Sequence, residues 1–124
     1  MKLLVSVMLG AVGIIHLLPL SGVLGSSRLK ALYGVPLDDP SLVILMRHRA
    51  VLFGILGVFL LVSAFRSELQ IVAFSAGFIS VGSFLFLAGT AGEYNARIRS
   101  IFLADLAALA CLLAGITGYF LMNP

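Results

Sequence analysis

The stretch that decides the fold is LVILMRHRAVLFGILGVFLLVSAF, residues Leu42 to Phe65. A transmembrane helix needs about 20 mostly apolar residues to cross a hydrocarbon core about 30 Å thick, and this run is long enough. Its charged and titratable residues form one triplet near the start, Arg47-His48-Arg49. The run therefore predicts a helix that crosses a membrane, with cationic side chains close to one end.

Three more apolar runs of similar length occur along the chain: Leu3 to Leu20, Leu69 to Gly89 and Ile101 to Met122. They leave a long first loop, Ser21 to Ser41, and two short ones. The composition agrees, because 61% of the residues are hydrophobic and 10% are charged, whereas soluble domains are roughly 45–50% apolar. We expect one all-α domain, residues 1–124, folded as an integral membrane four-helix bundle with up-down-up-down topology.

The first run has a second interpretation. Lys2 and the segment Val23-Leu24-Gly25 resemble the basic start and the cleavage site of a secretory signal. Removal of that segment would leave three spans and discard His16, a polar residue within an apolar run. The prediction kept here is four spans.

Basic residues are divided unevenly between the two ends of the predicted bundle. Six lie at the end that holds the first and third loops, and Lys2 and Arg66 lie at the other end; the six are Arg28, Lys30, Arg47, Arg49, Arg97 and Arg99. Because cytoplasmic loops are enriched in Lys and Arg, we expect loops one and three in the cytoplasm and both termini on the non-cytoplasmic side of an inner membrane. The formal net charge of +3 forms no basic stripe, so nucleic-acid binding is not predicted.

Acidic residues and histidines gather at the same end. Asp38, Asp39, Glu93 and Asp105 lie there, and Glu68 is the one acid at the other end. A charged group inside a membrane faces the bundle interior, pairs with another charge or extends to the interface. We expect Asp105 to face inward and to pair with an arginine of the second run. The candidate ligand-binding residues are Arg47, His48, Arg49, Glu93, Asp105 and His16.

Each candidate also has a structural interpretation. Arg47 and Arg49 could extend to lipid phosphates and fix the depth of the helix, and ion pairs with Asp105 or Glu93 could be purely structural. The two histidines have no His-x-x-His or Glu-x-x-His companion, so no metal site is predicted. Cys111 is the only cysteine and is interpreted as a packing residue.

Small residues indicate where helices approach one another closely. Gly10 and Gly13 in the first run and Gly54 and Gly57 in the second are the expected contact points. In the third run, small residues at helical spacing predict an inward face, and the phenylalanines are then expected to face lipid or to serve in packing. The small set is Ala73, Ala76, Ser80 and Ser83; the opposite set is Phe74, Phe78, Val81 and Leu85.

Three short motifs resemble a known group of proteins. They are Leu32-Tyr33-Gly34, Asp38-Asp39-Pro40 and the arginine pair of the second run, Arg47 with Arg49. Together they resemble small four-span bacterial membrane proteins of the DoxX-like group, whose function is unknown. The resemblance implies the same four-span architecture and assigns no catalytic residue.

Three functional hypotheses follow. The first is a membrane protein that binds a lipid-like or quinone-like molecule at the polar cluster near the cytoplasmic side. The second is an accessory subunit or homo-oligomer with a structural ion-pair cluster, and the third is an intramembrane isomerase or oxidoreductase that uses His48 or Asp105. No nucleotide-binding or nucleophile motif occurs, so binding without catalysis is favoured. Expected partners are membrane lipids and a second copy or another membrane subunit; no cofactor is predicted beyond a quinone or lipid.

Overall fold

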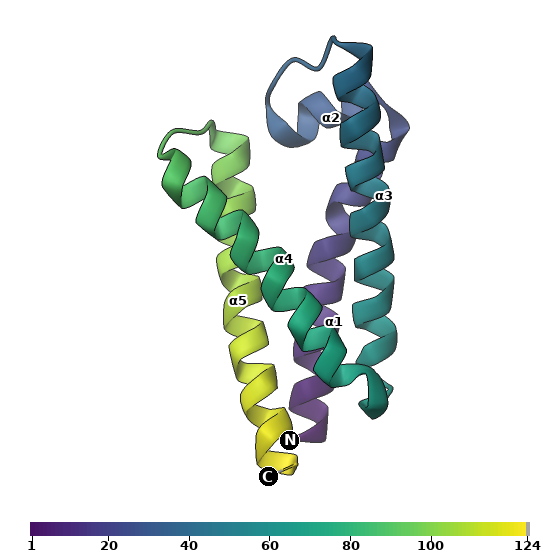
Figure 1. The fold of residues 1–124 in the computed structure, drawn as a ribbon, viewed down its shortest axis with the longest axis vertical. Helices are drawn as coiled ribbons and strands as arrows, with labels where there is room; N and C mark the ends of the chain where they lie inside the picture. The colour runs from purple at the N-terminus through teal and green to yellow at the C-terminus, as the bar shows by residue number, and fades with distance from the viewer. Residues whose placement is uncertain (124) are drawn as a thin grey trace.

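The computed structural model describes residues 1–123, and this part of the chain is helical with no strand. Figure 1 shows four long helices in one bundle, with a short helix near one end. In chain order the elements are α1 (Lys2–Leu17), η1 (Leu18–Leu24), α2 (Ser26–Tyr33), α3 (Pro40–Ser63), η2 (Ser67–Leu69), α4 (Gln70–Ala91) and α5 (Ala96–Met122). The predicted all-α bundle is confirmed.

Four helical segments in the described residues are long and apolar enough to cross a membrane: Lys2–Leu24, Pro40–Ser63, Ser67–Ala91 and Ala96–Met122. They coincide with the four predicted runs within a few residues. Their outward surfaces are apolar; Leu3, Ile44, Ile79, Phe86 and Leu121 are all more than 60% exposed. Soluble monomers rarely expose such large apolar surfaces, so the bundle has the outer surface of a membrane-embedded protein.

The predicted first loop, Ser21 to Ser41, contains helical structure. Pro19 has no backbone N–H for the next α-helical bond, and the chain continues from α1 as the 3-10 helix η1. Gly25, with φ 135°, then redirects the chain into α2. Leu29, Tyr33 and Leu37 of this segment form a buried cluster of their own.

Helix α1 is central in the bundle, because it packs against both α3 and α5, while α4 packs mainly on α5. Helices α3 and α4 are joined at one end by a short turn and diverge toward the other end (Figure 1). At the joined end, Gln70 Nε2 donates to the Ser63 carbonyl at 3.1 Å and Ser6 Oγ donates to the Ala64 carbonyl. The bundle is therefore tied together at this end and opens toward α2.

Glycines allow α1 and α3 to approach closely, as predicted for three of the four positions. A Cβ added at Gly57 would lie 2.9 Å from the Gly13 carbonyl oxygen, and one added at Gly54 would lie 2.7 Å from Leu20. The expectation for Gly10 is wrong, because a Cβ there would meet nothing within 4 Å. Gly13 and Gly57 therefore set the contact between α1 and α3, and Gly54 makes room for Leu20 of η1.

The predicted inward face of α4 is only partly right: Ala73 is fully buried and Ser80 bonds to His16, but large residues of the opposite set are buried as well. Phe74 and Val81 are fully buried in the core, with Phe78 and Leu85 packed against it, whereas Ser83 is exposed. The facing residues explain this result, because Gly115 of α5 would place a Cβ 2.8 Å from the Phe74 ring. The small residue that makes room lies on the partner helix, and the large aromatic side chain fills the space.

We predict that Gly57→Ala destabilises the bundle, because the added methyl group meets the backbone of α1 as well as the Leu17 side chain. Overpacking of this kind costs about 1–3 kcal/mol. Gly10→Ala is the matched control, because it adds the same atom in open space and should be neutral or stabilising. Thermal unfolding in one detergent measures both, and equal melting temperatures for the two variants would contradict the close contact.

Candidate functional site

A cavity of about 70 Å³ lies inside the bundle at the level where α3 and α4 have separated. Its walls come from α1, η1, α2, α3, α4 and α5, so all parts of the fold contribute to it. Most of the wall is apolar, and the exceptions are four side chains that reach it from four different helices: His16, Tyr33, Arg49 and Asp105. This cavity is the candidate site.

Arg49 is held in the cavity wall by two aromatic rings. Its guanidinium carbon lies 4.4 Å from the centre of the Phe53 ring and 5.3 Å from that of Tyr33. Arg49 Nη1 also donates a hydrogen bond to the Tyr33 hydroxyl. Ring faces and a hydroxyl oxygen stabilise the cation without neutralising it, so the guanidinium keeps its charge and its other donors toward the cavity.

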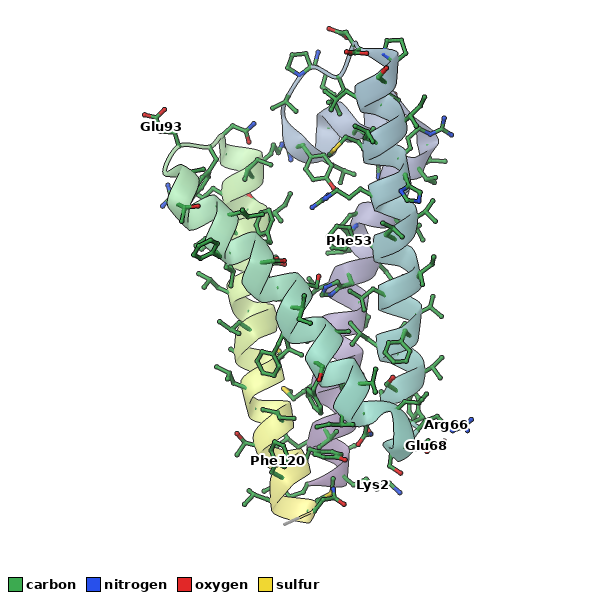
Figure 2. The ribbon with its side chains drawn as sticks, viewed as in Figure 1. Lys2, Phe53, Arg66, Glu68, Glu93 and Phe120 are labelled. Carbon is green, nitrogen blue, oxygen red and sulfur yellow. The ribbon has the colours of Figure 1, made fainter. Side chains whose placement is uncertain are left out.

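Asp105 faces the cavity, as predicted from the cost of placing a carboxylate against lipid. Its helical face also carries the buried residues Ala108 and Leu112. The predicted ion pair is wrong, because the one ion pair in residues 1–123 joins Arg66 to Glu68 at 2.7 Å at the opposite end of the molecule (Figure 2). Asp105 of α5 and Arg49 of α3 line the same space without forming an ion pair, and the guanidinium lies against the aromatic rings.

His16 is buried, with 3% of its surface exposed, and both ring nitrogens have partners. Nδ1 lies 2.9 Å from the Val12 carbonyl and Nε2 lies 2.9 Å from Ser80 Oγ. Because a carbonyl can only accept, Nδ1 carries the proton and, in the neutral ring, Nε2 accepts from the serine hydroxyl. His16 therefore lines the cavity with both ring nitrogens already bonded, and it links α1 to α4.

Two residues absent from the sequence prediction organise the site. Tyr33 supplies the ring and hydroxyl that hold Arg49, and Asn95 Nδ2 donates to the Tyr33 carbonyl at 2.9 Å. Asn95 also caps α5, because its Oδ1 accepts from the Ile98 N–H at 2.9 Å. The signal for Tyr33 was the Leu32-Tyr33-Gly34 motif, in which Gly34 ends α2 with φ 68°; no local pattern indicated the contact with Asn95.

The remaining three sequence candidates lie outside the cavity. Arg47 is exposed and its Nε donates to the Val23 carbonyl at 2.7 Å, so it fastens η1 to α3. His48 is exposed on the outer face of α3. Glu93 lies in the loop between α4 and α5 and points away from the bundle (Figure 2). The six candidates are therefore divided, and only Arg49, Asp105 and His16 are brought together.

Two further hollows adjoin the cavity. One, of about 190 Å³, is lined by Arg49, Leu52, Phe53, Leu56 and Ser80 and lies between α3 and α4. The other, of about 260 Å³, lies between η1, α2 and α5, and its margin includes Arg97 and Ser100. The inner cavity shares wall residues with both hollows, so a molecule could occupy the cavity and extend into either.

The arrangement is suited to binding a polar head group. Arg49 offers charged donors, Asp105 offers acceptors, and apolar walls exclude water around them, which strengthens both interactions. Residues 1–123 contain no group of three or more His, Cys, Asp or Glu side chains placed to hold a metal ion. Comparison with protein families, with curated proteins and with solved structures finds no match for this chain.

We predict that Asn95→Ala lowers the free energy of unfolding by about 1–3 kcal/mol, because it removes a helix cap and the hydrogen bond that joins α5 to α2. Asn123→Ala is the control, since Asn123 makes only an exposed bond to the carbonyl of its own helix at Tyr119. Chemical unfolding followed by circular dichroism compares them. An Asn95→Ala variant as stable as Asn123→Ala would contradict the joining role.

Proposed function

We propose that this membrane-embedded bundle binds a lipid-like or quinone-like molecule, with the molecule's polar head in the cavity between Arg49 and Asp105. The observation that carries the proposal is that two oppositely charged side chains face one enclosed space without contacting each other. Charged groups in apolar surroundings need hydrogen-bonding partners. A head with carbonyl or hydroxyl oxygens provides them, since it accepts from Arg49 and, where it has a hydroxyl, donates to Asp105.

The size of the cavity supports a head group with an attached apolar body. Sites that enclose a whole drug-sized ligand measure roughly 300–1,000 Å³, whereas the inner cavity measures about 70 Å³. It accommodates a few polar atoms, and the remainder of the molecule has to lie in an adjoining hollow. Head groups of membrane lipids and of quinones both have this form.

The accessory-subunit hypothesis began from a structural ion-pair cluster, and the described residues at this end contain no such cluster. Assembly with a second copy or another subunit stays a prediction. The resemblance to the DoxX-like group is likewise a proposal, and it is compatible with the four-span bundle. Catalysis by Asp105 has no supporting contact to a second catalytic group.

We also propose that the α2 end faces the cytoplasm of a bacterial inner membrane. The support is the placement of Arg28, Lys30, Arg97 and Arg99 on this end, against Lys2 and Arg66 at the other. The positive-inside rule then places both termini on the non-cytoplasmic side.

The binding proposal predicts that Arg49→Gln weakens binding of a decyl benzoquinone by about 10- to 100-fold, since a hydrogen bond to a charged group contributes about 1.5–3 kcal/mol. Native mass spectrometry in mild detergent measures the fraction of protein carrying one adduct at each quinone concentration. Arg47→Gln is the matched control, because it removes an arginine from the same helix that does not line the cavity, and it should bind like the wild type.

A melting temperature for each variant separates loss of binding from loss of folding. Arg49→Lys keeps the charge without the planar group that lies against the rings, and we expect an intermediate affinity. Equal affinities of Arg49→Gln and Arg47→Gln, or no saturable adduct on the wild type, would contradict the proposal.

The orientation proposal predicts the labelling of single cysteines in a Cys111→Ala background. In intact cells, a membrane-impermeant maleimide should label Ser67→Cys, in the turn between α3 and α4, and should leave Ser27→Cys, in α2, unlabelled until the membrane is opened. The reverse pattern would invert the topology. Labelling of both only after denaturation would place both positions inside the protein or the bilayer.

A further inference from the structure

The inner cavity has two outlets, and they differ in their depth along the bundle. The hollow between α3 and α4 extends from Arg49 to Leu52 and Leu56, which lie about 5 and 10 Å further along α3 from the α2 end, at 1.5 Å per residue. The hollow between α2 and α5 extends in the other direction, to Arg97, which precedes Asp105 on α5 by about 12 Å. The first hollow lies beside the apolar middle of α3, and the second lies toward the polar end.

We propose that the bound molecule enters and leaves sideways between α3 and α4, with its apolar tail in the hollow lined by Leu52, Phe53 and Leu56. This inference rests on the proposed function, because it assigns the tail of the molecule whose head occupies the cavity. Arg49 and Phe53 belong to the walls of both spaces, so the head and the start of the tail meet the same two side chains. The hollow between α2 and α5 also adjoins the cavity, through Leu18, Pro19, Tyr33, Ile101 and Ala104, so the choice between them rests on depth and wall chemistry. Figure 2 shows Phe53 pointing from α3 into the space that separates it from α4 and α5.

The chemistry of the wall favours an apolar occupant. Apart from Arg49, the one polar side chain in it is Ser80, whose Oγ is already bonded to His16 Nε2 at 2.9 Å. A hydrocarbon tail therefore passes it without leaving an unpaired polar group behind. The other hollow has Arg97 and Ser100 at its margin, and both are exposed, so a tail there would lie beside polar side chains near the polar end.

The fold also provides the opening. Helices α3 and α4 are fixed to each other at the Gln70 end, where Gln70 bonds to Ser63, and diverge toward the cavity (Figure 1). Helix α1, by contrast, contacts α3 closely through Gly13 and Gly57. Of the helix pairs that include α3, the pair with α4 is the one that leaves a hollow at hydrocarbon depth.

A photoreactive probe tests the path of the tail. The probe is a benzoquinone with a decyl chain that carries a diazirine midway along it, and a tail-less dimethoxy-methyl-benzoquinone serves as competitor. After illumination in bilayers, mass spectrometry should find adducts on Leu52 and Leu56 and on the α4 residues opposite them, and the competitor should abolish these adducts. Competitor-sensitive adducts on Ala31 or Ser100 would overturn the inference and place the tail between α2 and α5.

Blocking variants give an independent measurement. Leu52 and Leu113 are 52% and 53% exposed, so Leu52→Trp and Leu113→Trp are matched substitutions on α3 and α5. Leu52→Trp should lower the yield of adducts about tenfold by filling the hollow, while Leu113→Trp should leave the yield unchanged. Ala31→Trp, at the other outlet, should also leave it unchanged.

The tail-less quinone distinguishes the two levels of the proposal. If it binds the wild type and Leu52→Trp with equal affinity and this affinity depends on Arg49, binding of the head is supported. The positions of the adducts then identify the path of the tail. If it binds with Arg49 dependence but Leu52→Trp and Leu113→Trp give equal adduct yields, sideways entry between α3 and α4 is wrong and the proposed function stands. If it does not bind at all and no adduct is competed, both proposals are wrong.

Discussion

A guanidinium placed inside an apolar bundle is the constraint that shapes the open end of this molecule. Arg49 cannot be left unsolvated in hydrocarbon, since an unpaired charge there costs several kcal/mol or more, and the chain meets this requirement with two rings and one hydroxyl. Tyr33 reaches Arg49 because α2 folds back over the bundle. Asn95 keeps α2 there by bonding to the Tyr33 carbonyl while it caps α5. The segment between α1 and α3 is therefore part of the site.

The architecture was predictable because a bilayer allows few alternatives. Backbone groups in hydrocarbon have to bond within their own segment, so apolar runs of sufficient length specify helices, and glycines such as Gly13 and Gly57 indicate where two of them meet. The inward position of Asp105 followed from the same energetics. Pro19 and Gly25 also indicate local turns. The burial of Leu29 and Tyr33, in contrast, depends on contacts with residues distant in sequence.

The errors have a common physical cause. For α4, small residues alone do not identify the interior, because a helix interface needs complementary volumes. Gly115 on α5 makes room for Phe74 on α4. For the site, the prediction was an ion pair between opposite charges at one end. A guanidinium has alternative partners in ring faces and hydroxyl oxygens. In both cases the outcome depends on the facing helix. The periodicity of one helix does not indicate which helix faces it or how that helix is rotated. Arg47 and Arg49, two residues apart, thus have different environments: one bonds to a carbonyl of η1 and the other lines the cavity.

The two ends of the bundle differ in how closely their helices pack. Near the termini, Ser6, Gln70 and Phe74 tie α1, α3, α4 and α5 together through hydrogen bonds and close packing. Toward α2, the helices separate, and charged and aromatic side chains join aliphatic ones in the wall of the space between them. Helix α1 packs against both α3, which carries Arg49, and α5, which carries Asp105, and so keeps these two helices apart. Arg49 and Asp105 can therefore face each other across a cavity without collapsing into an ion pair, which leaves both available to a third group.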